Sequence, residues 1–306
     1  MQPSASQAAI GPYRLQGELA RGATSVVYRA LTPVGDPVAL KLFQASDERA
    51  RARFAEEVAA CLVLEHPYLL KVRDSGEFQQ RPYLVTDLVE GDSLAARLAR
   101  GPLAPSVAAE LVRKLAEGIE RVHQSGLLHR DLTPANVILR ANGDPVLIDF
   151  GLTRPSEGPR ASLTATGGTV GTPGYLPPEQ AANEKALVGP RSDVYGLGAV
   201  LYASLTGRPP IEGQSWVEVL AATCQRAPVA PSLLTPGLDP ELEELCLRCL
   251  RKDPQDRPGS AAEVAQGLAS YLDFSRPTSP ASRGPTRGLL LAAGLAALVA
   301  LTAAWW

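Results

Sequence analysis

Two polar runs most constrain what this chain can fold into. The first is His129-Arg130-Asp131-Leu132-Thr133-Pro134-Ala135-Asn136, and the second is Ile148-Asp149-Phe150-Gly151. Between them they supply two carboxylates and an amide, which are side chains that accept protons or bind divalent cations. Val38-Ala39-Leu40-Lys41 precedes them in a strand-like run, and Pro177-Pro178-Glu179 follows. Any one of these runs is a weak signal, but their combination in this order is specific.

The composition is that of a globular chain with an ordinary charge balance. Hydrophobic residues make up 45% of the 306 residues, which is ample for a buried core. The 30 basic residues are offset by 32 acidic ones, for a net charge of -2. Such a chain has no positive field to attract phosphates, so nucleic acid is not expected as a partner.

Four cysteines are spread thinly through the chain, and no signal peptide precedes them. This pattern favours a reducing compartment over a disulfide framework. Cys246 and Cys249 have the spacing of metal ligands, but no second Cys or His pair accompanies them. They share helical spacing with Leu242, Leu245 and Leu250, so core cysteines are favoured over a zinc site.

The first part of the chain predicts a small β-rich lobe. Residues 1–12 are small and polar and are expected to form a flexible arm. A helix is then predicted where Phe54, Val58, Cys61 and Leu62 recur every three to four residues. We place this N-lobe at about residues 13–86, with strand-like runs at Tyr13–Leu19, Ser25–Leu31 and Val38–Phe43.

The second part predicts a larger, mainly helical C-lobe at about residues 91–274. Its apolar residues recur at helical spacing in six segments. The fold class is therefore α+β, with two lobes. The six segments are Leu94–Leu98, Val107–Val122, Val194–Leu205, Val217–Cys224, Leu242–Leu250 and Ala261–Leu272.

The C-terminal part predicts a linker followed by a transmembrane helix. Residues 275–287 are rich in Pro, Ser, Thr and Arg and cannot bury enough surface to fold. Residues 288–306 carry no charge, and as a helix they would span about 28 Å, close to the hydrocarbon thickness. Arginines lie only on the N-terminal side, which predicts a cytoplasmic N-terminal part and a C-terminus outside. A buried alanine-rich helix is the alternative.

The polar runs and the two lobes together resemble the eukaryotic-type (Hanks-type) Ser/Thr protein kinases of bacteria. The resemblance covers roughly Tyr13 to Phe274. It implies ATP and Mg²⁺ or Mn²⁺ as cofactors and transfer of the γ-phosphate to Ser/Thr hydroxyls of cytoplasmic proteins. It also implies autophosphorylation, for which a homodimer would bring two copies together.

The resemblance assigns roles to the residues of the polar runs. Lys41 would contact the α- and β-phosphates, held by a carboxylate from the predicted helix; Glu57 fits best, with Glu56 as the alternative. Asp131 would accept or orient the proton of the acceptor hydroxyl. Asn136 and Asp149 would bind the metal ions. His129, by contrast, is expected to be a core residue.

The adenine slot follows from the same register. Thr86 is the expected gatekeeper, and the backbone of Asp87 and Val89 would pair with the base. The glycine-rich loop includes Ala20, Arg21 and Gly22, and only its middle glycine is kept. The apolar walls would be Leu19, Val27, Ala39 and Ile138.

Thr133 is a second departure from the family pattern, because Ser/Thr kinases usually carry a lysine there. That lysine neutralises the γ-phosphate, so its loss could cost about 3 kcal/mol of transition-state stabilisation.

Arg130 comes directly before Asp131. In relatives with this arrangement, the arginine pairs with a phosphorylated activation segment. Candidate regulatory residues in that segment are Thr164, Thr166, Thr169 and Thr172, the last of which is expected to hydrogen-bond Asp131.

Three further residues have expected structural roles. Glu179 and Arg257 should form a buried ion pair, and Asp193 should brace the catalytic loop.

Two rival functions remain open. One is a pseudokinase scaffold tethered to the membrane, suggested by the two departures. The other is phosphorylation of a small molecule, which is disfavoured because such relatives lack the segment from Thr172 to Glu179.

Overall fold

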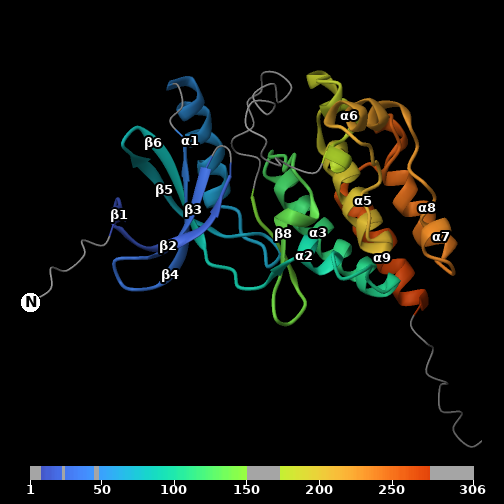
Figure 1. Cartoon of the computed structure of the whole chain (residues 1–306), viewed down its shortest axis with the longest axis horizontal. Coiled ribbons are helices and arrows are strands. Elements are labelled where there is room, and N and C mark those ends of the chain that lie inside the picture. The colour runs from blue at the N-terminus through green and yellow to red at the C-terminus, as the bar shows by residue number, and fades with distance from the viewer. Residues whose placement is uncertain (1–7, 23–24, 45–47, 150–172, 276–306) are drawn as a thin grey trace, which may run out of the picture. The chain divides into compact units, whose positions relative to one another are not determined.

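The structure is a computed structural model of the whole chain, and it describes residues 8–22, 25–44, 48–149 and 173–275. The chain divides into a unit of residues 1–272 and a unit of residues 273–306. The first unit contains a β-rich N-lobe and a mainly helical C-lobe (Figure 1). The predicted two-lobed α+β fold is therefore confirmed.

The N-lobe is an antiparallel sheet with one helix. Its strand order is β1-β2-β3-β4-β6-β5. The central strand β4 alternates as a two-residue repeat requires: Val38 and Leu40 are fully buried, whereas Ala39 and Lys41 point to the other face. The strands are β1 (Ala9–Ile10), β2 (Tyr13–Arg21), β3 (Ser25–Leu31), β4 (Pro37–Phe43), β5 (Val72–Phe78) and β6 (Arg81–Asp87).

The N-lobe begins earlier than predicted, because β1 lies inside the expected flexible arm. Ala9 and Ile10 pair with Arg14 and Tyr13 of β2. A turn at Gly11, with φ of +55°, folds the chain back so that Ile10 is 97% buried, being only 3% exposed. Burial of Ile10 and the turn at Gly11 are enough to add β1 to the sheet. The sequence did not predict β1, because a strand of two residues has no periodic pattern.

The helix of the N-lobe, α1 (Glu48–Leu62), carries the predicted apolar face. Phe54, Val58 and Cys61 are buried, and the Phe54 ring meets Phe43 edge to face with centroids 4.9 Å apart. Leu62 is 40% exposed, so it contributes less than its spacing suggested. Glu57 is half-buried and lies one turn before Cys61, at the edge of this apolar face.

The C-lobe is built around the buried helix α5, and each of the six predicted helical segments is confirmed. Gly198 of α5 lets α8 approach closely, since an added Cβ would lie 2.4 Å from the Cβ of Cys249. The principal helices are α2 (Leu94–Leu98), α3 (Pro105–Gln124), α4 (Pro178–Ala181), α5 (Pro190–Thr206), α6 (Trp216–Gln225), α7 (Pro231–Leu234), α8 (Pro240–Cys249) and α9 (Ala261–Ser275).

The cysteines of α8 are core residues, as predicted. Cys246 and Cys249 are fully buried, and burial raises the pKa of the Cys249 thiol to about 12. The Cys246 thiol also has a raised pKa, chiefly because of burial. Among the described residues, no group of three or more His, Cys, Asp or Glu side chains could hold a metal ion.

A small second sheet positions the catalytic loop. It consists of β7 (Asp92–Ser93), β8 (Val137–Leu139) and β9 (Pro145–Leu147) in that order. A 3₁₀ turn, η1 (Pro134–Asn136), leads directly into β8. The catalytic loop is thus held at its C-terminal end by a paired strand.

Within the described ranges, no helix is long and apolar enough to cross a membrane. The predicted linker from residue 276 onward and the predicted transmembrane helix at 288–306 lie outside those ranges. Both remain predictions.

Candidate active site

The loop between α3 and η1 holds Asp131 in a strained backbone setting. Arg130 has φ of +63°, in the left-handed region that favours glycine. Asp149 at the end of the second polar run has φ of +65°. Such conformations cost about 1–3 kcal/mol each and persist only where the surroundings fix them.

A buried carboxylate fixes the strained loop. Asp193, near the N-terminal end of α5, accepts hydrogen bonds from the backbone N–H of His129 at 2.8 Å and of Arg130 at 2.7 Å. The predicted brace is therefore confirmed. His129 itself is fully buried, in agreement with its expected core position.

Asp131 and Asn136 lie side by side across the loop. The Asn136 Nδ2 donates to the backbone carbonyl of Asp131 at 2.9 Å and to its Oδ2 at 3.1 Å. These bonds use the amide nitrogen, so the Asn136 Oδ1 is left as the acceptor that could bind a cation. The half-buried Asp131 is thereby held with one carboxylate oxygen beside an amide donor.

Lys41 and Asp149 meet, although they are 108 positions apart in the chain. The Lys41 ammonium forms an ion pair with the Asp149 carboxylate, and Lys41 is 19% exposed. The structure thus brings a strand of the N-lobe to the second polar run. Lys41, Asp131, Asn136 and Asp149 are the polar set that the resemblance assigned to phosphate and metal.

Glu57 does not join this set as the sequence predicted. Between these described residues there is no Lys41–Glu57 ion pair; the Glu57 Oε1 instead lies 4.0 Å from the Arg130 Nη1. Lys41 is already paired with the Asp149 carboxylate, so its charge is neutralised without Glu57. The side chain of the alternative, Glu56, is outside the described part.

The residues expected to bind adenine lie on neighbouring strands of the N-lobe sheet and on the hinge, the segment that follows β6 and leads into the C-lobe. Ala39 is paired with Thr86 across β4 and β6, and Val27 is paired with Lys41 across β3 and β4. Thr86 is buried, with 6% of its surface exposed. Ile138 lies on β8 and is half-buried, whereas Leu19 is 50% exposed.

The hinge leaves a free backbone donor. The Asp87 N–H donates to the Lys71 carbonyl at 3.1 Å, whereas the Val89 N–H makes no backbone hydrogen bond within the described ranges. Gly91 ends the hinge with φ of +150°, and an added Cβ would lie 2.0 Å from the Leu139 carbonyl oxygen. The glycine therefore allows the hinge to lie directly against β8.

The loop that replaces the glycine-rich motif is a hairpin between β2 and β3. The Gly22 N–H donates to the Ser25 carbonyl at 2.9 Å, and Ala20 pairs with Val27. Arg21 forms an exposed ion pair with Glu18, and its hydrogen bonds lower the pKa of the Glu18 carboxyl. Ala20, which stands where the family has glycine, is accommodated on this exposed edge.

Thr133 lies at the N-terminal end of η1, with extended backbone angles. Its carbonyl accepts the Asn136 N–H at 3.0 Å, and its side chain makes no capping hydrogen bond. It is half-buried. The position usually occupied by lysine therefore contributes no charge here.

The predicted ion pair behind the activation segment is confirmed. Arg257 Nη1 and Nη2 each lie 2.8 Å from a Glu179 carboxylate oxygen, and both side chains are almost fully buried. Ser192 donates to the same carboxylate at 2.6 Å. The candidate regulatory residues Thr164, Thr166, Thr169 and Thr172 lie outside the described ranges.

One residue of the loop's support was missed by the sequence reasoning. His123, in the last turn of α3, has its Nε2 2.8 Å from the Asp193 Oδ2. The available signal was a histidine one residue beyond the predicted helical segment Val107–Val122 and six positions before His129.

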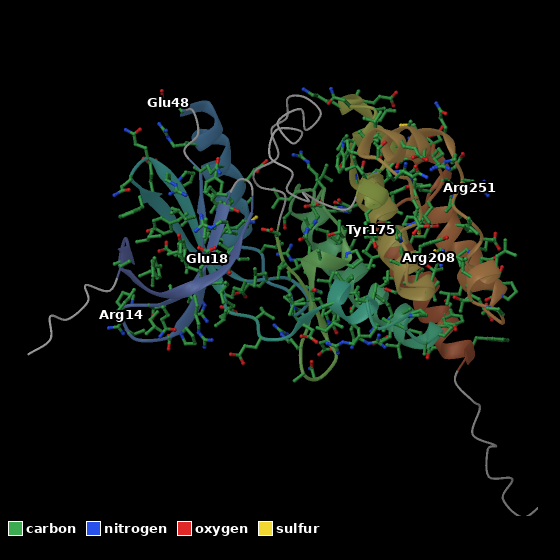
Figure 2. All side chains as sticks on the ribbon, viewed as in Figure 1. Arg14, Glu18, Glu48, Tyr175, Arg208 and Arg251 are labelled. Atoms are coloured by element: carbon green, nitrogen blue, oxygen red, sulfur yellow. The ribbon has the colours of Figure 1, made fainter. Side chains whose placement is uncertain are left out.

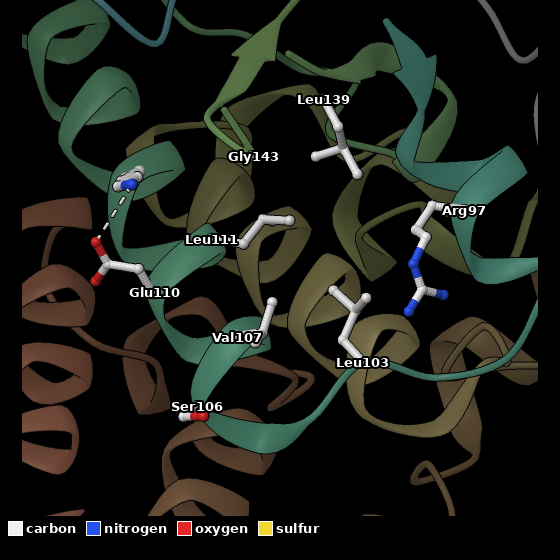
Figure 3. Close-up of a pocket in the computed structure, with 9 residues that line it drawn as sticks. Arg97, Leu103, Ser106, Val107, Glu110, Leu111, Leu139 and Gly143 are labelled. Atoms are coloured by element: carbon white, nitrogen blue, oxygen red, sulfur yellow. Dashed lines mark ion pairs between the residues drawn. The ribbon is translucent and has the colours of Figure 1, made fainter. Parts of the chain in front are cut away.

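A separate cavity of about 370 Å³ lies in the C-lobe beside the first turns of α3. Figure 3 shows its apolar wall, to which Leu103, Val107 and Leu111 contribute. None of the predicted site residues lines it, although Leu139 on its wall is the neighbour of Ile138 in β8. It is therefore distinct from the predicted nucleotide site.

Comparison with known proteins decides the family. Residues 13–268 match the family model described as the protein kinase domain. The chain belongs to the protein kinase family. It is 37% identical over 272 residues to the probable serine/threonine-protein kinase SCO3848 of Streptomyces coelicolor, which covers 86% of this chain and 40% of that protein. PknL, a serine/threonine-protein kinase of Mycobacterium tuberculosis, is 36% identical over 266 residues, or 85% of this chain and 66% of PknL.

A solved structure agrees with this assignment. The crystal structure of the Mycobacterium tuberculosis PknI kinase domain superposes with a TM-score of 0.69 at 28% identity, covering 87% of this chain and 98% of that one. The predicted membership in the bacterial Hanks-type group is confirmed by these relatives. The chain spans 40% of the length of SCO3848 and 66% of that of PknL.

Proposed function

We propose that this protein kinase family member is an ATP-dependent serine/threonine kinase acting on cytoplasmic proteins. The observation that carries the proposal is the meeting of two polar pairs, Lys41 with Asp149 and Asn136 with Asp131. The Ile148 N–H, one residue before Asp149, donates to the Asn136 carbonyl at 2.8 Å and so brings the two pairs together. Phosphoryl transfer needs positioning and charge neutralisation more than covalent chemistry, and these four side chains supply both.

The donor atoms present fit Mg²⁺ or Mn²⁺ and ATP. The Asn136 Oδ1 and the Asp149 carboxylate are the oxygen ligands that such cations prefer, and a bound cation would neutralise phosphate charge. Lys41 would then exchange its contact with Asp149 for the phosphates. The free Val89 N–H and the Asp87 carbonyl would hold the adenine edge.

Each chain residue has a defined part in the proposed reaction. Asp131, fixed by Asn136, would accept the proton of the acceptor hydroxyl and orient its oxygen toward the γ-phosphate. Thr133 adds no positive charge, so we expect a modest rate. A scaffold without catalysis is the less favoured alternative, because it would not need all four polar side chains.

We also propose autophosphorylation between two copies, with Thr164 or Thr166 as the first acceptor. Arg130 supports this idea, because a phosphate could compete with Glu57 for its guanidinium; the two now lie 4.0 Å apart. Glu57, once released, could turn to Lys41.

We further propose that residues 288–306 anchor the chain in the cell membrane, on the strength of their uncharged composition.

The test is phosphorylation in trans. The full chain is incubated with ATP and Mg²⁺ together with an Asp131→Asn copy that carries a distinguishable tag, and phosphorylated residues are mapped. Phosphate on Thr164 or Thr166 of the tagged copy is the expected result. Phosphate on tyrosine alone would reject the Ser/Thr assignment, and phosphate only on the untagged copy would reject transfer between copies.

A further inference from the structure

The cavity of about 370 Å³ in the C-lobe lies between α2, the first turns of α3 and the β8–β9 turn. Its volume is in the range of small-molecule pockets, which combine an apolar lining with a few placed polar groups. Val107 on its wall is 53% exposed, so the cavity is reached from solvent. Figure 3 shows four apolar side chains that converge on one central space, those of Leu103, Val107, Leu111 and Leu139.

The walls of the cavity are held in place without a ligand. The segment between α2 and α3 contains Pro102 and is fixed where the Leu103 N–H donates to the Ser204 carbonyl at 2.8 Å. The β8–β9 turn closes where the Gly143 N–H donates to the Arg140 carbonyl at 2.8 Å, with φ of +83° at Gly143. A ligand therefore has little of the protein to order when it binds.

The charged groups on the wall leave one cation without a counter-ion. The Glu110 carboxylate accepts two hydrogen bonds from Arg113, each at 2.8 Å, and Lys114 donates to Asp144 at 2.6 Å. Arg97, by contrast, makes no ion pair within the described ranges, and its Nη1 donates to a backbone carbonyl at 3.0 Å. Its other N–H donors remain for a planar anion, which a guanidinium binds through two of them.

Strand β8 separates the cavity from the predicted nucleotide site. Leu139 lines the cavity, whereas its neighbour Ile138 is predicted as an adenine wall, and successive side chains of a strand point to opposite faces. The two sites therefore share a strand but no side chain. A ligand in the cavity leaves the nucleotide site open.

We propose that this cavity binds a small amphiphilic carboxylate, with its aliphatic part among the apolar side chains and its carboxylate on Arg97. Strand β8 is paired on both sides, so the cavity offers no free strand edge to a peptide backbone. The uncompensated charge of Arg97 disfavours a cationic ligand. Binding here goes beyond the proposed function and does not require catalysis.

The test is photolabelling of the full chain with decanoic acid that carries a diazirine on its aliphatic part, followed by mapping of the label by mass spectrometry. We expect label on residues 97–114 or 139–143, removed by excess decanoate but not by ATP with Mg²⁺. The amine with the same chain should label these residues at least about tenfold less, because it cannot pair with Arg97. Mapping separates the cavity from residues 288–306, which are also apolar.

Two substitutions test the walls, each with a matched control. Val107→Phe should fill part of the cavity and lower the labelling at least about fourfold, the effect of one excluded methylene group. Val229→Phe should leave it unchanged, because Val229 is also 53% exposed but lies outside the cavity. Arg97→Gln should remove the preference for the acid over the amine, whereas Arg100→Gln on the same helix should keep it.

Three results would overturn the proposal. Label confined to other residues, or equally strong in Val107→Phe and Val229→Phe, would place the probe elsewhere, and loss of the label on adding ATP would place it in the nucleotide site. Equal labelling of the parent by the acid and the amine would favour an uncharged occupant, such as an apolar side chain of a partner protein. This last comparison does not depend on whether Val107→Phe folds, and none of the readouts needs phosphate transfer.

Discussion

At the scale of single residues, the site depends on polar groups whose partners are far away in the sequence. Arg130 and Asp149 adopt left-handed backbone conformations that most residues avoid. The buried Asp193 carboxylate holds the first of them through two backbone hydrogen bonds. The strain is thus located beside the residues that we expect to act on phosphate, where pre-organisation has a functional use.

Asp131→Asn tests the proposed proton acceptor. Transfer should fall by at least about 100-fold, because an amide cannot take the hydroxyl proton. Folding should be retained, since the Asn136 Nδ2 still bonds to the backbone carbonyl of residue 131 at 2.9 Å. Initial rates and thermal unfolding measure the two effects, and unchanged turnover would remove Asp131 from its role.

Thr133→Lys tests the departure from the family pattern. A lysine would restore a positive charge near the γ-phosphate, so the rate should stay equal or rise by up to about 100-fold. The Thr133 side chain makes no capping hydrogen bond in η1 that the substitution would break. A large loss of rate would show that Thr133 belongs to a different phosphate-binding arrangement.

At the scale of elements, periodicity predicted the helices and the first strands well. The repeats of α3, α5 and α8 follow from one buried face or a wholly buried helix, which the local sequence encodes directly. The three-strand sheet was missed, because β7, β8 and β9 contain only two or three residues each. Strands that short are defined by their partners and show no period of their own.

The same limit applies to the site. Lys41, Asp131, Asn136 and Asp149 could be predicted because their spacing is a family pattern. The pairing of Glu57 could not, since it depends on how α1 is oriented against the rest of the chain. His123 was overlooked because a histidine on a helix has many ordinary uses.

Arg257→Ala tests the ion pair that ties α4 to the loop after α8. The substitution leaves the Glu179 carboxylate buried without its cation, which should destabilise the protein by about 3–5 kcal/mol. Urea unfolding of the protein measures this change in the free energy of unfolding. Arg251→Ala is the matched control, because that side chain is exposed (Figure 2) and should change stability by less than about 0.5 kcal/mol. Equal effects of both substitutions would contradict the assigned role.

At the scale of the whole molecule, the kinase domain accounts for residues 13–268, and we propose that residues 288–306 anchor the chain in a membrane. Removing residues 288–306 should move the protein from the membrane fraction to the soluble fraction, because an uncharged, apolar segment of membrane-spanning length is lost. Fractionation with a carbonate wash measures this. Continued carbonate-resistant membrane association of the shortened chain would place the anchor elsewhere.

Transfer of labelled γ-phosphate from ATP by the full chain, with Mg²⁺ or Mn²⁺, tests the central claim most directly. The matched comparison is Asp149→Ala, which removes the carboxylate that lies beside Lys41. Label on serine or threonine in the parent, and its loss in the variant with folding retained, is the predicted result. No label from a folded parent that still binds ATP would contradict the account and favour a scaffold without catalytic activity.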